Sequence, residues 1–182
     1  YNARVLAILL PAATLGIALG YFTAKLVSEA WVTVLIGVIG LVFALNLLIK
    51  RRMIVEPARA EVAPGLFWGA VTGFTSFVSH SGGPPYQVYT MPLGMSKAVF
   101  AGTSTIAFAY INAVKLIPYY LLGQINLANL EKVLVLMPIA AASVFLGVKL
   151  VKWLPERLFF QLVTWALLLV SIKLIWDGYK AI

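Results

Sequence analysis

Long apolar stretches dominate the chain, and only a few short polar segments separate them. A helix needs about 20 mostly apolar residues to cross a bilayer. Five stretches reach that length and predict membrane-spanning helices at residues 5–23, 31–49, 98–120, 132–150 and 157–176. Short loops join the first two stretches and the last two, so each pair is predicted to form a helical hairpin.

A sixth apolar stretch, residues 65–77, is shorter, and as a helix it extends only about 20 Å. The sequence Ser-His-Ser-Gly-Gly-Pro-Pro interrupts it at residues 79–85, and apolar character resumes at 86–93. Proline suits the first turn of a helix, where its missing N–H has no intrahelical partner to lose. The pattern therefore predicts two half-helices separated by a break, at residues 65–93.

The positions of lysine and arginine indicate whether these half-helices cross the membrane. If they return to the side they came from, nine basic residues share one side and two lie on the other. If they cross, the tally becomes six against five. Short cytoplasmic loops are enriched in Lys and Arg. The lopsided distribution favours the return, which predicts a re-entrant hairpin that enters from the cytoplasm.

The chain also resembles itself when it is shifted by 127 positions. Polar, glycine and proline residues match in one ungapped register: Asn2 with Asn129, Pro11 with Pro138, Gly20 with Gly147, Lys25 with Lys152 and Glu29 with Glu156. The two helical hairpins are thus predicted to be copies of one unit in opposite orientations. The second copy follows residues 65–128, so we expect a counterpart of about 63 residues before the first copy.

These patterns predict an all-α polytopic membrane protein, an inverted-repeat transporter with re-entrant, discontinuous helices and an incomplete first repeat. Residues 1–49 form the C-terminal helical hairpin of the first repeat, and residues 50–62 form a cytoplasmic linker. Residues 63–182 form the second repeat.

Composition excludes several other classes of protein. The 182 residues are 62% hydrophobic and 11% charged, with a mean hydropathy of +0.97. A water-soluble monomer is excluded because too little polar surface exists to cover an apolar core. The absence of cysteine excludes disulfides and cysteine-ligated metals, and the single histidine, His80, argues against a zinc site. The net charge of +8 is interpreted as a topology signal, not as nucleic-acid binding.

The break at 79–85 is the main candidate binding site. Irregular backbone at membrane depth is tolerated only where it lines a cavity or lies buried in protein. The amides at the start of the second half-helix would attract an anion. We expect the substrate to contact Ser79, His80, Ser81, Gly82 and Gly83. The alternative is a structural break whose polar side chains bond only to neighbouring carbonyls.

His80 is also the candidate proton carrier, because histidine changes its charge near neutral pH. A neutral, hydrogen-bonded structural histidine is the alternative. Ser81 beside His80 does not predict a protease, since sequence neighbours rarely point a base at a nucleophile.

The predicted span 98–120 carries further candidate ligands of an anion: Thr103, Ser104, Thr105, Asn112 and Lys115. Ser104 and Lys115 are eleven residues apart, about three helical turns, so they share one face. Lys115 would attract a negatively charged substrate, or its side chain would extend to the headgroup layer. The Ser and Thr hydroxyls would alternatively bond to their own helix backbone.

The chain resembles the sulfite exporter TauE/SafE family, also called the TSUP family. The resemblance rests on residues 69–85, 89–93, 102–104 and 112–122, and it extends over essentially the whole chain. Residues 81–83 read Ser-Gly-Gly where many members carry three glycines. The resemblance implies a location in the bacterial inner membrane and the transport of sulfur-containing anions such as sulfite or organosulfonates, often by export.

The leading functional hypothesis is therefore a secondary transporter for a small sulfur anion, with protons as the candidate coupling ion and without enzymatic activity, metal or cofactor. An anion channel with the same site as its filter is the alternative. A membrane-embedded accessory subunit is a third class, which would leave the break at 79–85 without a purpose.

Overall fold

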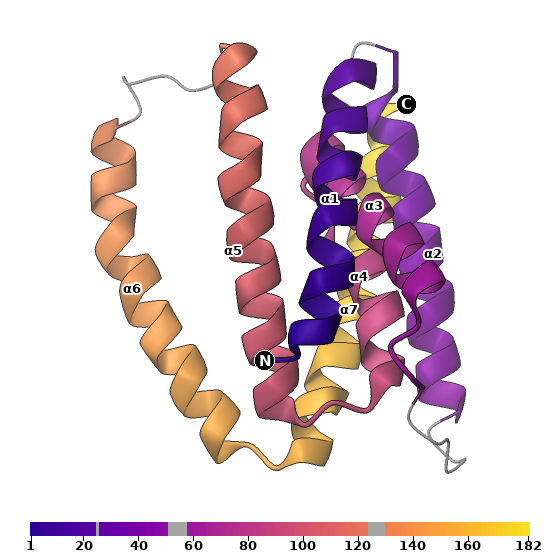
Figure 1. Ribbon diagram of the computed structural model, residues 1–182, viewed down its shortest axis with the longest axis vertical. Helices are drawn as coiled ribbons and strands as arrows, with labels where there is room; N and C mark the ends of the chain where they lie inside the picture. Colours follow the sequence, from indigo (N-terminus) through magenta and orange to yellow (C-terminus); the bar gives the residue numbers. More distant parts are fainter. Residues whose placement is uncertain (25, 51–57, 124–129) are drawn as a thin grey trace.

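The computed structural model describes residues 1–24, 26–50, 58–123 and 130–182. Within these ranges the chain is helical and contains no strand. The helices run in a bundle with their long axes roughly aligned (Figure 1). In chain order they are α1 (Ala3–Thr23), α2 (Glu29–Lys50), α3 (Val62–Ser79), α4 (Gly83–Thr90), the 3₁₀ helix η1 (Met91–Leu93), α5 (Lys97–Leu121), α6 (Leu130–Trp153) and α7 (Glu156–Ala181).

All five predicted spans are confirmed as helices, with ends within a few residues of the predicted ones. By length and composition, six helices are able to cross a membrane, because α3 qualifies as well. It has 18 residues and thus extends about 27 Å. The sequence placed its start at Gly65, but the helix begins at Val62, since Pro64 is tolerated in a first turn. Length alone therefore no longer separates α3 from a membrane span.

The hairpin made by α3 and α4 brings the chain back to the end where it started. The amide of Ala58, just before α3, donates to the carbonyl of Pro92 at 2.9 Å. The hydroxyl of Tyr89 on α4 donates to the carbonyl of Glu61 at 3.1 Å. Entry and exit of the hairpin are thus bonded to each other. The chain thus returns to the end of the bundle at which α3 begins. That the α3–α4 hairpin is re-entrant in a membrane stays a prediction.

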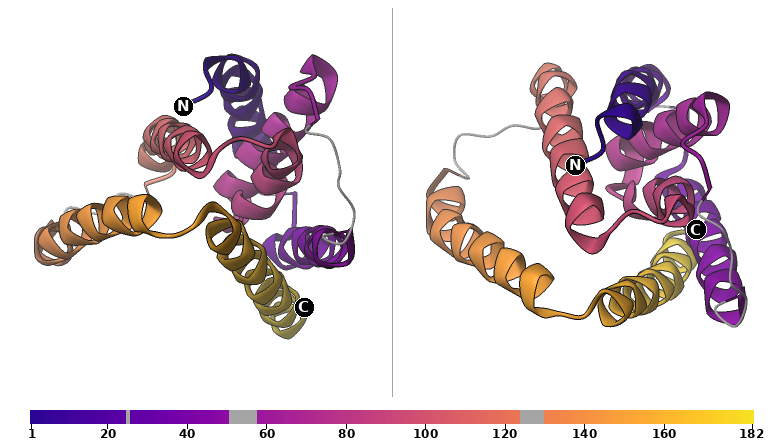
Figure 2. Two further views of the ribbon diagram at one scale, coloured as in Figure 1. Left: turned by 90° about the horizontal axis from the view of Figure 1, so that it is seen from below. Right: turned by 60° about the horizontal axis from the view of Figure 1, so that its bottom comes forward.

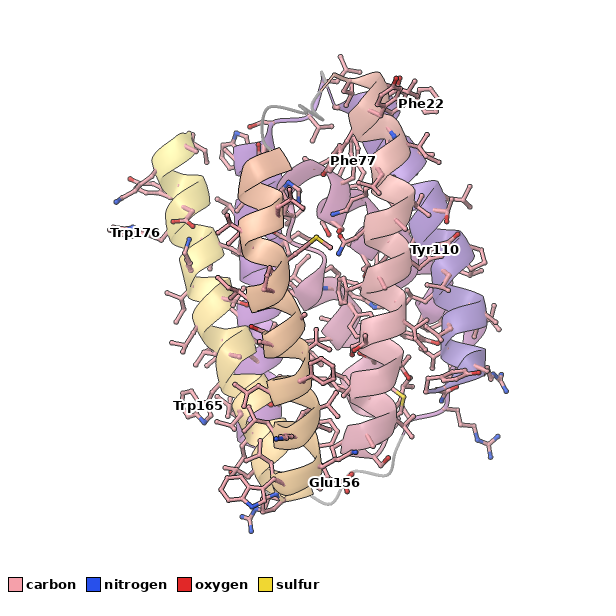
Figure 3. The ribbon with its side chains drawn as sticks, turned by 90° about the vertical axis from the view of Figure 1, so that its left-hand side faces the viewer. Phe22, Phe77, Tyr110, Glu156, Trp165 and Trp176 are labelled. Carbon is pink, nitrogen blue, oxygen red and sulfur yellow. The ribbon has the colours of Figure 1, made fainter. Side chains whose placement is uncertain are left out.

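Other basic residues gather at the same end of the bundle as this entry. The ammonium of Lys97, at the start of α5, donates to the carbonyls of Lys152 and Leu154 at the turn between α6 and α7. Figure 3 shows Glu156 at this end and Phe22 at the opposite one. Part of the predicted linker, residues 51–57, lies outside the described residues.

Helices α1 and α3 pack in parallel through glycines that let their backbones touch. A Cβ built on Gly16 would lie 2.0 Å from the carbonyl oxygen of Ala70, and one on Gly73 would lie 2.0 Å from that of Ala13. A Cβ on Gly69 would lie 3.0 Å from the carbonyl oxygen of Leu9 and 3.0 Å from the Cβ of Ala12. Small residues permit such close approach of helices in membranes. The glycines in residues 65–73 thus serve close packing of α3 against α1.

Helices α2 and α7 form the second extensive contact, and they run antiparallel. Gly37 and Gly40 of α2 lie against Ser171 and Ile175 of α7, and Gly178 lies against Val34. Gly40 also faces Pro84 at the start of α4. The tip of the α3–α4 hairpin therefore rests on the middle of the α2–α7 pair.

Helix α6 lies apart from the rest of the bundle, next to α5 (Figure 2). The hairpin of α1 and α2 and the hairpin of α6 and α7 run in opposite directions along the bundle (Figure 1). Two of the residues whose matches predict the repeat, Lys25 and Asn129, lie outside the described residues.

Replacing Gly73 with alanine should destabilise the protein, because the new methyl group would collide with the α1 backbone at Ala13. Overpacking of this kind costs about 1–3 kcal/mol. Gly102 is a matched control on α5, since a Cβ there meets only ordinary contacts at 3.6 Å or beyond. Thermal unfolding in detergent should rank Gly73→Ala below wild type and Gly102→Ala at or above it. Equal melting of the two variants would contradict the close α1–α3 contact.

Candidate functional site

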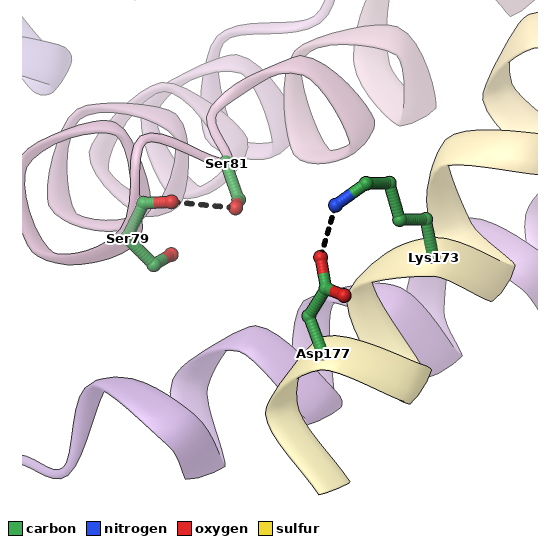
Figure 4. Close-up of polar contacts among 4 residues, drawn as sticks. All are labelled: Ser79, Ser81, Lys173 and Asp177. Carbon is green, nitrogen blue, oxygen red and sulfur yellow. Dashed lines mark hydrogen bonds and ion pairs between the residues drawn. The ribbon is translucent and has the colours of Figure 1, made fainter. Parts of the chain in front are cut away.

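The break after α3 is closed by hydrogen bonds to one carbonyl oxygen. The carbonyl oxygen of Thr75 accepts hydrogen bonds from the amide of His80, from the amide of Ser81 at 3.2 Å and from the hydroxyl of Ser79 at 3.2 Å. The hydroxyl of Ser81 donates to the carbonyl of Ser79 at 2.8 Å (Figure 4). The hydroxyls of Ser79 and Ser81 thus bond within the break in this conformation, as the structural alternative describes.

His80 ends α3 in the left-handed conformation, with φ of 53° and ψ of 19°. It is the only non-glycine residue with positive φ among the described residues. His80 is exposed, and its ring lies near that of Tyr119, with 6.0 Å between the ring centroids. The imidazole is therefore accessible. The backbone of His80 is strained, because its conformation favours glycine.

The two glycines that follow have different surroundings. A Cβ on Gly82 would lie 2.9 Å from the Ser76 side chain and from the carbonyl of Thr72, so only glycine fits against α3. A Cβ on Gly83 would meet no atom within 4 Å. Pro84 and Pro85 occupy the first turn of α4 and carry no amide proton. The amides able to meet an anion at this helix end are therefore those of Gly82 and Gly83, which make no hydrogen bond within the described residues.

Lys115 of α5 reaches into the last turns of α3. It is 5% exposed, and its ammonium donates to both the carbonyl and the hydroxyl of Ser76, each at 3.0 Å. The ammonium lies 5.9 Å from the centre of the Tyr119 ring, whose hydroxyl donates to the carbonyl of Phe77 at 3.0 Å. Its side chain therefore points into the protein and not toward a headgroup layer. The described residues place no carboxylate in an ion pair with it.

The other candidates on α5 divide between two sides of the helix. Ser104 faces the hairpin, where its hydroxyl donates to that of Tyr86 at 3.1 Å, so Ser104 and Lys115 share a face as predicted. Thr103 faces α1 and accepts from the amide of Asn2 at 2.8 Å. Thr105 and Asn112 are exposed on α5. The structure thus brings Ser104 and Lys115 to the hairpin and leaves the other three elsewhere.

Two cavities open beside the break. One, of 250 Å³, is lined by His80, Tyr119 and Glu29, together with apolar side chains. The other, of 570 Å³, is lined by Ser79, Thr33, Glu29 and Asp177. Asp177 pairs with Lys173 one turn earlier on α7 (Figure 4). Glu29, at the start of α2, borders both cavities.

Two polar residues near the break were missed by sequence reasoning. The side-chain oxygens Oε1 of Gln87 and Oγ of Ser171 are buried without a hydrogen-bond partner in the described structure. Gln87 follows Pro84 by one turn of α4, and its polarity inside an apolar half-helix was a usable signal. Ser171 offered none, because only the fold places it against Gly40 and near Pro84.

A broken helix held inside a bundle of long apolar helices defines a multi-pass membrane protein with a buried polar site. A profile of the sulfite exporter TauE/SafE family matches residues 1–174. The chain therefore belongs to this family of membrane transporters. Searches of curated proteins and of solved structures found no match.

His80→Gly should stabilise the protein, since glycine adopts the left-handed conformation without the strain of a Cβ. The relief is about 1 kcal/mol, because a non-glycine residue in this conformation is disfavoured by about 1–2 kcal/mol. His80→Ala is the control, as alanine loses the imidazole but keeps the strain. Thermal unfolding should place the glycine variant above both wild type and the alanine variant. A glycine variant that melts with the alanine variant would show that the backbone at residue 80 is unstrained.

Proposed function

We propose that this protein is a secondary transporter that exports a small sulfur-containing anion, such as sulfite or an organosulfonate, across the bacterial inner membrane. Its family supports transport of such anions. The observation that carries the proposal is the buried ammonium of Lys115, which lies at the break between two half-helices without a carboxylate partner among the described residues. A buried cation of this kind attracts an anion, because little water is present to screen it.

The proposed anion site lies around Ser76. Lys115 bonds to Ser76 from the α5 side, and Gly82 packs against Ser76 from the other side of the break. A sulfur oxyanion carries several acceptor oxygens, so it is suited to receive the ammonium and the amides of Gly82 and Gly83 together. The positive end of α4 adds to the attraction. Ser79, Ser81, Thr103, Thr105 and Asn112 remain candidate ligands for other conformations of the transport cycle.

The proposed transport step exchanges one partner of Lys115 for another. In the described conformation its ammonium bonds to Ser76, and in the loaded conformation part of this bonding would pass to the anion. The last turn of α3 would then be released, and the hairpin would shift against α5 and expose the site to the other side. Movement of one bundle against another around a fixed site is the usual form of alternating access.

The charges around the break favour release of the anion on the side of the membrane that the tip of the α3–α4 hairpin faces. Glu29 borders both cavities there, and its exposed carboxylate repels an anion. Most of the basic residues outside the predicted spans lie at the opposite end, where they would raise the local concentration of anions before binding. If the basic end is cytoplasmic, as the topology predicts, this asymmetry supports export.

Lys115→Gln should weaken binding of sulfite or an organosulfonate at least tenfold, because it removes the buried positive charge but keeps a donor for Ser76. Lys115→Arg retains the charge and should bind more tightly than the glutamine variant. Lys149→Gln is the charge-matched control, since Lys149 is exposed on α6. Binding is measured by thermal shift with sulfite, thiosulfate, sulfoacetate, sulfolactate and taurine. If the Lys115→Gln variant is folded and binds the anion with wild-type affinity, Lys115 is not part of the anion site.

The proposed proton-coupling role of His80 is tested with the glycine variant, which removes the imidazole without adding backbone strain. In proteoliposomes this variant should lose accumulation of the anion against its gradient or lose the pH dependence of transport. Wild-type flux with an unchanged pH dependence would contradict the coupling role. Wild-type protein that never accumulates its substrate and whose flux does not saturate would instead be an anion channel.

A further inference from the structure

Two cavities lie along the contact of the α3–α4 hairpin with α2 and α7, which we call the seam. The cavity beside Ser79, of 570 Å³, is bordered by the start of α2, the end of α3 and the last turns of α7. A second cavity, of 280 Å³, is bordered by the last turns of α2, the end of the hairpin at Met91 and the first turns of α7. The seam therefore has one cavity toward each end of the bundle.

Between the two cavities the seam is closed by direct contact. A Cβ on Gly40 of α2 would collide with the hydroxyl of Ser171 on α7 and would lie 3.0 Å from the Cβ of Pro84 on α4. Leu167 and Leu168, which precede Ser171 on α7, are buried as well. In the described conformation these residues thus form a barrier between the cavities.

The barrier contains two polar atoms that no partner satisfies within the described residues. Ser171 is 0% exposed, and its hydroxyl makes no hydrogen bond. Serine and threonine in a helix usually bond to the carbonyl four residues earlier, as Thr164 does with Phe160 at 2.8 Å. The hydroxyl of Ser171 faces Gly40 instead. Gln87, one turn after Pro84, has an equally unpartnered Oε1.

Buried polar side-chain atoms are nearly always hydrogen-bonded, so two orphaned ones at one level indicate a polar occupant in another conformation. An apolar barrier would have served better if nothing polar passed it. A hydroxyl and a side-chain amide both donate and accept, so together they are able to bond to the oxygens of a small anion.

The two cavities differ in charge. Arg157 is the one charged residue among the described residues that line the smaller cavity, which lies at the basic end of the bundle. The larger cavity is lined by Glu29 and by Asp177, and Asp177 is paired with Lys173. An anion is therefore attracted at the Arg157 cavity and repelled by Glu29 at the other.

We propose that the seam is the route of the anion through the protein. The Arg157 cavity is its entrance, Ser171 and Gln87 are the polar groups that it passes at the barrier, and the cavity beside Ser79 is its exit. The anion passes when the hairpin moves away from α7 and frees these two side chains to donate to it.

This inference rests on the proposed function and adds a path to the proposed site. Gly82 and Gly83 directly precede Pro84, which forms part of the barrier. The seam thus leads to their amides from the side of α2 and α7, whereas Lys115 reaches the break from α5.

The test uses cysteine labelling, since the chain contains no cysteine. Ser171→Cys is reconstituted in lipid vesicles and treated with sulfonatoethyl methanethiosulfonate, a water-soluble reagent that itself carries an organosulfonate group. The trimethylammonioethyl reagent is similar in size and carries the opposite charge. Leu169→Cys is the matched control, because it is exposed on the other side of α7, where a lipid-facing thiol does not ionise. Each rate is divided by the rate of the same reagent with a small thiol in water.

We expect the anionic reagent to label Ser171→Cys about ten times faster than Leu169→Cys, because the basic entrance concentrates anions. It should also label Ser171→Cys faster than the cationic reagent does. Arg157→Gln in the Ser171→Cys background should slow the anionic reagent, whereas Lys149→Gln, on the exposed surface of α6, should not. Gln87→Cys is the reporter if Ser171→Cys does not fold.

Labelling of Ser171→Cys as slow as that of Leu169→Cys would show that the seam stays closed and would overturn the proposal. Equal labelling by the two reagents would show a water path without preference for anions and would overturn it as well. Labelling needs no transported substrate, so its outcome is independent of the binding test on Lys115.

Discussion

A helix that ends inside a bundle of apolar helices needs hydrogen-bond donors from the protein for its last carbonyl groups, because few other polar groups surround them. The end of α3 meets this constraint from three directions. The amide of Ser81 donates to the carbonyl of Thr75. The ammonium of Lys115 donates to the carbonyl of Ser76, and the hydroxyl of Tyr119 donates to the carbonyl of Phe77. The position of α5, the left-handed residue at 80 and the burial of a lysine all follow from this one requirement.

The same requirement explains why the hairpin is so closely packed. A broken helix is tolerated only if neighbouring helices shield it, and shielding requires backbones to approach. Gly16 and Gly73 remove the side chains that would hold α1 away from α3, and Gly82 does the same inside the break. Gly40 lets the start of α4 rest against α2 and α7. Gly16, Gly40 and Gly73 therefore serve close packing around the break, whereas Gly82 and Gly83 are the glycines that we propose to meet the anion.

Much of the fold was predictable from the sequence, and the site was predictable only in part. Hydrophobic length located the five spans, and the Gly-Gly-Pro-Pro sequence located the break. The sequence could show that Ser104 and Lys115 share a face, because helical spacing is a local property. It could not show which helix that face meets, so Ser76 and Tyr119 were not singled out. It also could not distinguish Thr103 from Ser104, since the direction of each side chain depends on how α5 packs between α1 and the hairpin.

Lys115 connects the architecture with the proposed transport. The ammonium of Lys115 has a structural role, since it bonds to Ser76, and we propose that the same ammonium binds the anion. As long as it bonds to Ser76, the end of α3 is held against α5. In the proposed mechanism, an anion that competes for the same three ammonium protons would weaken that contact, so anion binding and movement of the hairpin would be linked through a single side chain. A ligand shifts a conformational equilibrium only by its difference in affinity for the two states. In the proposed mechanism, competition with Ser76 would supply such a difference, because the anion would bind best in the state in which the Lys115 ammonium no longer bonds to Ser76.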